Sequence, residues 1–118
     1  MTYEFKIKTA NPHFPQIEDV TPQEVLNATT ELKLVDVREV SEYTGELGHA
    51  PATELVVLST LPEKINALPK DRSIVFICRS GGRSAQAAAF AKSQGFTDVY
   101  NMIGGMLLWN QLQLPTEK

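Results

Sequence analysis

Short apolar runs of strand length alternate along this chain with helix-forming segments, and this alternation constrains the fold more than any other feature. Three such runs occupy residues 32–37, 54–58 and 73–77. The last is the most apolar, which predicts a strand at the centre of a sheet that is covered on both faces. The alternation therefore predicts an α/β fold, with a central parallel sheet of about five strands and helices on both faces.

Capping residues mark the expected helix boundaries. Thr21 suits the N-cap position, Pro22 suits the first helical position, and Glu24 completes a capping box. Gly95 is expected to end the alanine-rich helix 84–94. The other expected elements are an edge strand at Tyr3–Lys8, a helical turn at 41–43, a helix at 61–68, a strand at 98–102 and a helix after Gly104-Gly105.

Composition restricts the class of protein. The 118 residues suit one domain, 1–118, in which residues 1–20 form an N-terminal extension. The net charge of −3 disfavours a nucleic-acid partner. Because no apolar run reaches the ~18 residues of a membrane span and no signal peptide is visible, we expect a cytoplasmic protein without a membrane partner. One cysteine and two histidines provide neither a disulfide nor a zinc site, so no metal or cofactor is expected.

The loop Cys78-Arg79-Ser80-Gly81-Gly82-Arg83-Ser84 follows the most apolar run and carries the predicted chemistry. Sites in parallel sheets lie at the carboxyl ends of the strands. The glycines allow a tight curl whose N–H groups point inward, and the following helix directs its positive end to the same place. This environment should favour the Cys78 thiolate. With Arg79 and Arg83 on the rim, the loop is predicted to hold a thiolate or persulfide nucleophile for an anionic substrate.

Two other interpretations of the loop are open from the residues alone. Cys78 could be a small hydrophobic residue at the end of a strand, with the glycines simply forming a turn. A loop that binds a nucleotide phosphate would need a lysine after its last glycine. Arg83 follows Gly82 instead, which disfavours the second interpretation.

Motifs along the chain resemble those of the rhodanese-like sulfurtransferase domains over nearly all of residues 20–115. They are Asp36-Val37-Arg38 with Glu42-Tyr43, Gly48-His49-Ala50-Pro51, the loop from Cys78 to Ala85, and the segments Gly95–Asn101 and Gly104–Trp109. The resemblance implies that Cys78 takes the outer sulfur of an anionic donor such as thiosulfate and releases sulfite. The Cys78 persulfide would then pass that sulfur to cyanide, to a thiol or to a sulfur-accepting protein. Residues 79–84 would hold the persulfide, and Arg79 and Arg83 would attract the anions.

The resemblance includes two kinds of domain, sulfurtransferases and phosphatases, and the length of the active loop distinguishes them. Four residues separate Cys78 from Arg83, whereas the phosphatase-type relatives have five. The longer loop suits a tetrahedral phosphate and the shorter one a single added sulfur, so sulfur transfer is predicted rather than phosphoester hydrolysis. The chain departs from the usual pattern at Ala50-Pro51-Ala52-Thr53 and Glu54-Leu55-Val56-Val57. These departures leave the substrate preference open.

Five residues are expected to support the loop: Asp36, Arg38, Glu42, His49 and Trp109. Asp36 either accepts backbone N–H bonds from the loop or supports only the fold, with Arg38 paired to Glu42. His49 could donate a proton, but a hydrogen bond that fixes its own loop is favoured. Trp109 is expected in the core and could also line the pocket.

Three functions remain open at this stage. The first is a catalytic sulfurtransferase, the second a persulfide carrier for a protein acceptor, and the third a non-catalytic interaction domain. An intact loop argues against the third function. The lone cysteine also argues against a mechanism resolved by an internal disulfide.

Overall fold

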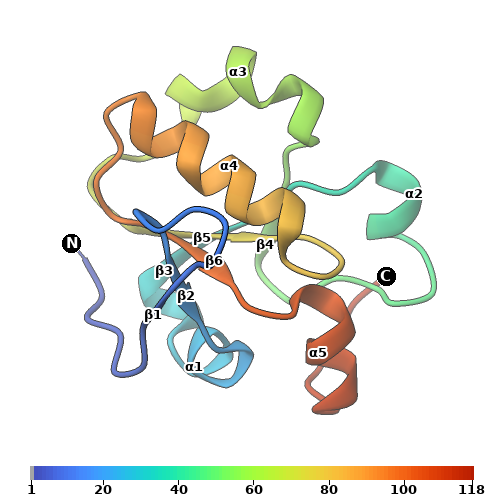
Figure 1. Ribbon diagram of the computed structural model, residues 1–118. Helices are drawn as coiled ribbons and strands as arrows, with labels where there is room; N and C mark the ends of the chain where they lie inside the picture. The colour runs from blue at the N-terminus through green and yellow to red at the C-terminus, as the bar shows by residue number, and fades with distance from the viewer. Residues whose placement is uncertain (1) are drawn as a thin grey trace.

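The computed structural model describes residues 2–118, which form a sheet with helices on both faces (Figure 1). Within these residues the sheet has six strands in the order β1-β2-β6-β5-β3-β4. All neighbouring strands are parallel except β1 and β2, which are antiparallel. The strands are β1 (Thr9–Ala10), β2 (Glu18–Val20), β3 (Leu32–Asp36), β4 (Thr53–Leu55), β5 (Ser73–Ile77) and β6 (Val99–Met102). The predicted α/β class is confirmed, and the sheet gains one antiparallel edge strand.

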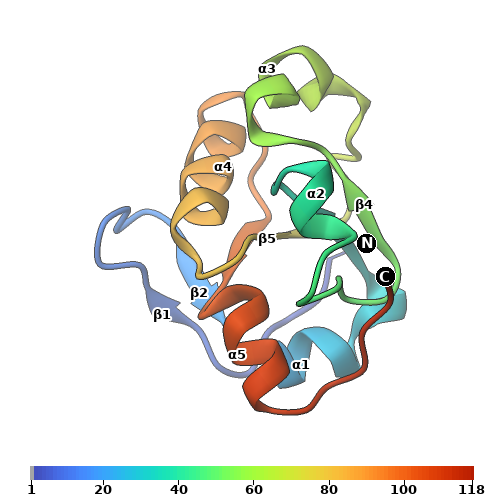
Figure 2. The same ribbon diagram turned by 90° about the vertical axis from the view of Figure 1, so that its right-hand side faces the viewer.

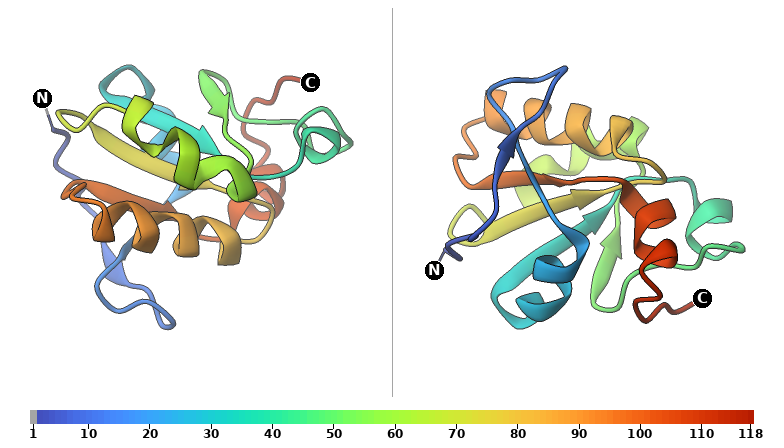
Figure 3. Two further views of the ribbon diagram at one scale, coloured as in Figure 1. Left: turned by 90° about the horizontal axis from the view of Figure 1, so that it is seen from above. Right: turned by 60° about the horizontal axis from the view of Figure 1, so that its bottom comes forward.

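The helices divide between the two faces of the sheet. Figure 3 shows α3 and α4 over one face and α1 and α5 over the other. The short helix α2 lies beyond the carboxyl end of β3 (Figure 2). The bounds are α1 (Pro22–Asn27), α2 (Val40–Tyr43), α3 (Leu61–Lys64), α4 (Gly82–Ser93) and α5 (Gly105–Gln111), with 3-10 turns at Thr29–Glu31, Leu58–Thr60 and Ile65–Ala67.

Strand β5 lies inside the sheet and contributes to two separate cores. Ile74 and Phe76 pack into the core under α3 and α4. Val75 and Ile77 point the other way, into the core that contains Trp109 of α5. All five residues of β5 are buried, as expected for a central strand between two helical layers.

The expected edge strand at Tyr3–Lys8 is wrong. The Glu24 carboxylate accepts hydrogen bonds from the Tyr3 hydroxyl at 2.9 Å and from the backbone N–H groups of Lys6 and Ile7 at 2.8 and 3.3 Å. The edge strand is Thr9–Ala10 instead. An alternating pattern predicts a strand only where a neighbouring strand is available to pair with it. Here the Glu24 carboxylate accepts the backbone N–H hydrogen bonds that a neighbouring strand would otherwise accept.

Only one of the two hydrogen bonds of the predicted capping box forms at the start of α1. Thr21 Oγ1 accepts a hydrogen bond from the Glu24 N–H at 3.4 Å. The Glu24 side chain, which would complete a capping box, binds the N-terminal segment instead.

Two expected elements are shorter than predicted. The run at 54–58 pairs only as Thr53–Leu55, and the chain then enters a 3-10 turn. The helix at 61–68 is α3 followed by the 3-10 turn Ile65–Ala67. Gly95 ends α4 with φ +95°, a conformation that favours glycine, as the sequence indicated.

Candidate active site

Cys78 lies where β5 leaves the sheet and the chain turns into α4. Its side chain is 1% exposed. Sγ accepts a hydrogen bond from the Gly81 N–H at 3.0 Å, and the Ser84 hydroxyl lies 3.2 Å away. Gly81 has φ +107°, a left-handed conformation that allows the loop to curl back on the sulfur. The loop therefore curls so that the Gly81 N–H is directed at the sulfur.

Helix α5 holds the same loop from the other side. The Met106 N–H donates to the Cys78 carbonyl at 2.9 Å, and the Leu107 N–H donates to the Arg79 carbonyl at 3.0 Å. Gly105 has φ +55°, and a Cβ there would lie 2.6 Å from the Arg79 carbonyl oxygen. Glycine is therefore needed at this position so that the two backbones can approach. The first N–H groups of α5, which have no partner inside the helix, are used to fix the loop.

A fully buried ion pair follows β3. The Arg38 guanidinium donates to both Asp36 carboxylate oxygens, with Nε–Oδ1 2.9 Å and Nη2–Oδ2 2.8 Å, and its Nη2 also donates to the Gly48 carbonyl at 2.7 Å. Asp36 and Arg38 are 0% and 1% exposed. The expected bond from the loop to the Asp36 carboxylate is wrong, and so is the expected pair of Arg38 with Glu42, because Asp36 and Arg38 bind each other. The alternative in which Asp36 supports the fold agrees with this geometry. A bidentate geometry between residues two apart explains the choice.

Arg83 is paired with a carboxylate across the site. Its two terminal nitrogens donate to the two oxygens of Glu42, each at 2.8 Å. The Arg83 hydrogen bonds lower the pKa of Glu42 to about 2, against an opposing effect of burial. In turn the Glu42 carboxylate raises the pKa of Arg83. The Arg83 charge is thus engaged with helix α2, whereas Arg79 is exposed at the rim.

The contacts of His49 and Trp109 are made with other parts of the chain. His49 Nδ1 lies 2.8 Å from the Tyr43 carbonyl, and its ring stacks on the Tyr43 ring with 3.7 Å between centroids. These contacts match the loop-fixing alternative for His49. Trp109 is fully buried in the core, and its indole N–H donates to the Pro115 carbonyl at 2.9 Å. Trp109 therefore belongs to the core, as predicted.

Sequence reasoning placed Ser84 in the loop but missed the polar side chains that lie beyond it, Asn101, Asp19 and Asn11. Ser84 Oγ contacts Asn101 Oδ1, and Asn101 Nδ2 donates to Asp19 Oδ1 at 2.9 Å. Asn11 Nδ2 donates to the same Asp19 oxygen at 2.9 Å. The available signal was a polar residue inside each of two short strands, Asp19 in β2 and Asn101 in β6.

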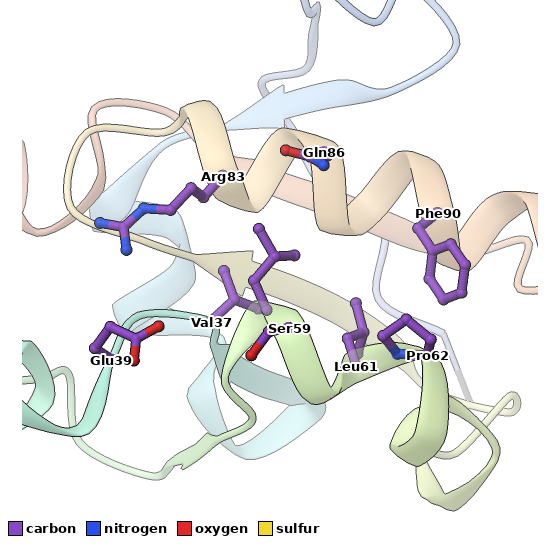
Figure 4. A pocket seen from close by; sticks show the side chains of 9 residues that line it. Val37, Glu39, Ser59, Leu61, Pro62, Arg83, Gln86 and Phe90 are labelled. Atoms are coloured by element: carbon purple, nitrogen blue, oxygen red, sulfur yellow. The ribbon is translucent and has the colours of Figure 1, made fainter.

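Three hollows surround the loop. One, of about 360 Å³, lies beside Arg79 and Glu42, and a second, of about 380 Å³, lies between Gly81 and the segment that contains Asn11. The third is an apolar groove of about 460 Å³ between α3 and α4, and Figure 4 shows Arg83 and Phe90 at its two ends. The loop is thus accessible from more than one side.

Residues 2–118 contain neither a metal-binding cluster nor a membrane-spanning helix. No cluster of three histidine, cysteine, aspartate or glutamate side chains there could hold a metal ion. Among the helices of the same residues, none is both long enough and apolar enough to cross a membrane.

Comparison with known proteins points to one family. The family model for the rhodanese-like domain matches residues 21–112. A sulfurtransferase of Allochromatium vinosum is 34% identical over 100 residues, which cover 85% of this chain and 92% of that protein. The thiosulfate sulfurtransferase GlpE of Pseudomonas fluorescens is 36% identical over 76 residues, covering 64% of this chain and 68% of that protein.

A solved structure agrees with these relatives. The human single-domain sulfurtransferase TSTD1 superposes with a TM-score of 0.70 at 26% identity, covering 79% of this chain and 95% of the human chain. The range matched by the family model contains Cys78 and the whole loop, whereas Asn11 and Asp19 precede it.

Proposed function

The chain belongs to the rhodanese-like domain family, and from this premise we propose that it is a sulfurtransferase that carries a sulfane sulfur as a persulfide on Cys78. One observation carries the proposal. The lone cysteine lies at the carboxyl end of β5, where the Gly81 N–H points at its sulfur and the Ser84 hydroxyl lies 3.2 Å away. Donors of this kind stabilise a thiolate, which is the form that attacks sulfur.

The proposed cycle has two displacement steps. The Cys78 thiolate attacks the outer sulfur of thiosulfate, a new S–S bond forms at Sγ, and the donor's own S–S bond breaks so that sulfite leaves with the electron pair. In the second step a thiolate or cyanide acceptor attacks the outer sulfur of the persulfide, and Cys78 leaves as a thiolate. No net oxidant is needed, and the protein returns to its starting state.

In this proposal, one arginine binds the anionic donor and another holds the loop in place. Arg79 is exposed beside the hollow of about 360 Å³ and is the proposed contact for thiosulfate. Arg83 is bound to Glu42, so we assign it to bracing the loop against α2. The buried Asp36–Arg38 pair reaches the Gly48 carbonyl and would fix the neighbouring loop in the same way. Helix α4 directs its positive end to the sulfur.

Mass spectrometry of the intact protein tests this function. After incubation with thiosulfate, the chain is expected to gain one sulfur atom, and Cys78→Ser is expected to gain none. Cyanide, glutathione and a candidate acceptor protein are then added separately, and loss of the added mass identifies the acceptor. Turnover with small acceptors indicates an enzyme, and release to a protein alone indicates a sulfur carrier. A folded chain that never gains sulfur from thiosulfate or another sulfane donor would contradict the proposal.

The rival hydrolytic function needs its own assay. Four residues between Cys78 and Arg83 favour sulfur transfer over phosphoester hydrolysis. Hydrolysis of a phenyl phosphate ester by the wild-type chain and by Cys78→Ser is expected to be equal and at background level. Cleavage that depends on Cys78 would instead support a phosphatase.

A further inference from the structure

A chain of buried polar side chains leads from the sulfur of Cys78 to the N-terminal region. Ser84 Oγ lies 3.2 Å from Sγ and also contacts Asn101 Oδ1. Asn101 Nδ2 and Asn11 Nδ2 each donate to Asp19 Oδ1 at 2.9 Å. Ser84, Asn101, Asp19 and Asn11 are all at most 6% exposed, and the last three also border the hollow beside Gly81.

The Asp19 carboxylate fixes the orientation of the Asn101 amide. An ionised carboxylate accepts hydrogen bonds and donates none, so the amide NH₂ of Asn101 must face Asp19. The amide carbonyl then faces the Ser84 hydroxyl. Asp19 and Asn101 are direct partners in the register of β2 and β6, so the sheet itself holds the two side chains together.

The Ser84 hydroxyl has one proton and two neighbours that can accept it. When the proton points to the Asn101 carbonyl, a lone pair of Ser84 Oγ faces Sγ, and this suits a protonated thiol that donates its S–H. When Cys78 is a thiolate, the proton is needed at the sulfur. The Asn101 carbonyl then faces the hydroxyl oxygen with no proton between them, which costs the energy of a lost buried hydrogen bond.

We propose that Asn101, oriented by Asp19, is a positioning residue that competes with the Cys78 thiolate for the Ser84 hydroxyl proton and so restrains the reactivity of the unloaded cysteine. It acts through Ser84, since its own partners are Ser84 and Asp19. The inference shares one assumption with the proposed function, namely that Cys78 reacts as a thiolate. It concerns the free thiol, before any sulfur is bound.

Besides Asp19, several charged groups face this region and are the same in every variant. They come from the active loop, from the end of β3 and from α2: Arg83, Asp36, Arg38 and Glu42, with Arg79 exposed on the rim of the loop. Because a double-mutant cycle compares the same substitution in two backgrounds, additive contributions of these charges cancel.

Alkylation of the lone cysteine by iodoacetamide, followed across pH, measures the thiolate directly. Asn101→Ala is expected to increase the alkylation rate near neutral pH by about fivefold, the effect of one buried hydrogen bond, and to move the midpoint of the curve to lower pH. The plateau rate at high pH should stay unchanged, because that rate reports access to the sulfur. In a Ser84→Ala background the same Asn101→Ala substitution is expected to have no effect.

Asp19→Ala provides a second variant in case Asn101→Ala does not fold. Without the carboxylate, the Asn101 amide can turn its NH₂ towards Ser84 Oγ, which releases the hydroxyl proton to the sulfur. The expected change has the same direction and the same dependence on Ser84. Asn110→Ala is the matched control, because Asn110 on α5 donates to the Leu47 and Met106 carbonyls and lies outside the polar chain. The Asn110→Ala variant should show the same alkylation rate at each pH as the wild type.

Three results would overturn the inference. They are an unchanged or slower rate at neutral pH in folded Asn101→Ala, an equal acceleration in the Ser84→Ala background, or a rise in the plateau rate that accounts for the whole change. Circular dichroism establishes that each variant is folded. Since alkylation needs no sulfur donor, a failure of sulfur loading and a failure of this inference are separate outcomes.

Discussion

The two sides of the active loop are held by different kinds of interaction. On the side of β3 and α2, the contacts are ion pairs. Glu42 with Arg83 braces the active loop and is partly exposed, whereas Asp36 with Arg38 is fully buried and holds the neighbouring loop at the Gly48 carbonyl. On the side of β2 and β6, they are hydrogen bonds among Ser84, Asn101, Asp19 and Asn11, all buried. The comparison separates bracing between opposite charges from a network of polar side chains gathered around the Asp19 carboxylate.

Removal of the sulfur should have the largest effect on activity and a small one on stability. Cys78→Ser is expected to abolish sulfur loading, because a hydroxyl cannot form a persulfide. Both sides of the loop keep their own contacts, so the melting temperature should change little. Intact mass after thiosulfate and a thermal melt measure the two quantities. A Cys78→Ser chain that still gains a sulfur atom would exclude Cys78 as the carrier.

Breaking the buried ion pair should cost the most stability. Arg38→Ala leaves the Asp36 carboxylate buried without its partner, and the free energy of unfolding is expected to fall by about 3–5 kcal/mol. Urea denaturation measures the loss. Lys33→Ala is the control, because its pair with Glu54 is more exposed and should be worth at most ~1 kcal/mol. Equal losses in both variants would show that burial of the pair is unimportant.

The Glu42–Arg83 pair should be the part of the bracing that acid removes. The folded state lowers the pKa of Glu42 to about 2, from 4.5, chiefly through the Arg83 hydrogen bonds. A depressed carboxyl pKa stabilises the fold above the unfolded value, and that stabilisation is lost as pH falls from about 4.5 to about 2. Glu42→Gln is expected to cost about 1–2 kcal/mol at pH 6 and almost nothing near pH 2.

Urea denaturation from pH 6 downward measures this difference between wild type and Glu42→Gln. Glu63→Gln is the matched control, since Glu63 is exposed on α3 and should leave the pH dependence unchanged. A constant difference between wild type and Glu42→Gln at all pH values would mean that the charge of Glu42 is not what braces the loop.

Substitution of the exposed Arg79 should weaken binding of the sulfur donor and leave stability nearly unchanged. Arg79→Ala is expected to raise KM for thiosulfate several-fold while the free energy of unfolding changes by no more than ~0.5 kcal/mol, as for most surface substitutions. Steady-state kinetics at low and high salt measure the effect, which salt should diminish. Lys64→Ala, an exposed cation on α3, serves as the control. Unchanged kinetics in Arg79→Ala would assign donor binding elsewhere.

The sequence predicted the parts of the fold that depend on local pattern. The run Ser73–Ile77 was expected at the centre of the sheet, and it lies between β6 and β3. Thr21 was expected to cap α1, and its hydroxyl accepts from the Glu24 N–H. The curl of the loop after Cys78 followed from its glycines, and Gly81 has the expected positive φ. Each of these depends on residues close together in the chain.

The choice of partners could not be predicted in the same way. Arg83 binds Glu42, a residue 41 positions earlier in the chain, and only the positions of α2 and α4 bring the two side chains together. The contact of Asp19 with Asn101 requires β2 to lie beside β6, although 82 residues separate the two in the chain. Strand order decides such contacts, and local sequence pattern does not contain it.

Helix α5 holds the active loop through backbone hydrogen bonds, so the side chains of the loop are not needed for this attachment. Met106 and Leu107 hold the loop through the carbonyl oxygens of residues 78 and 79, groups that every amino acid possesses. The side chains of Arg79 and Ser80 are exposed and contribute nothing to this attachment. Substitutions at these two positions can therefore change which donor or acceptor the protein prefers while the sulfur stays in place. The rim of the loop can thus vary in sequence while the Cys78 sulfur keeps its position.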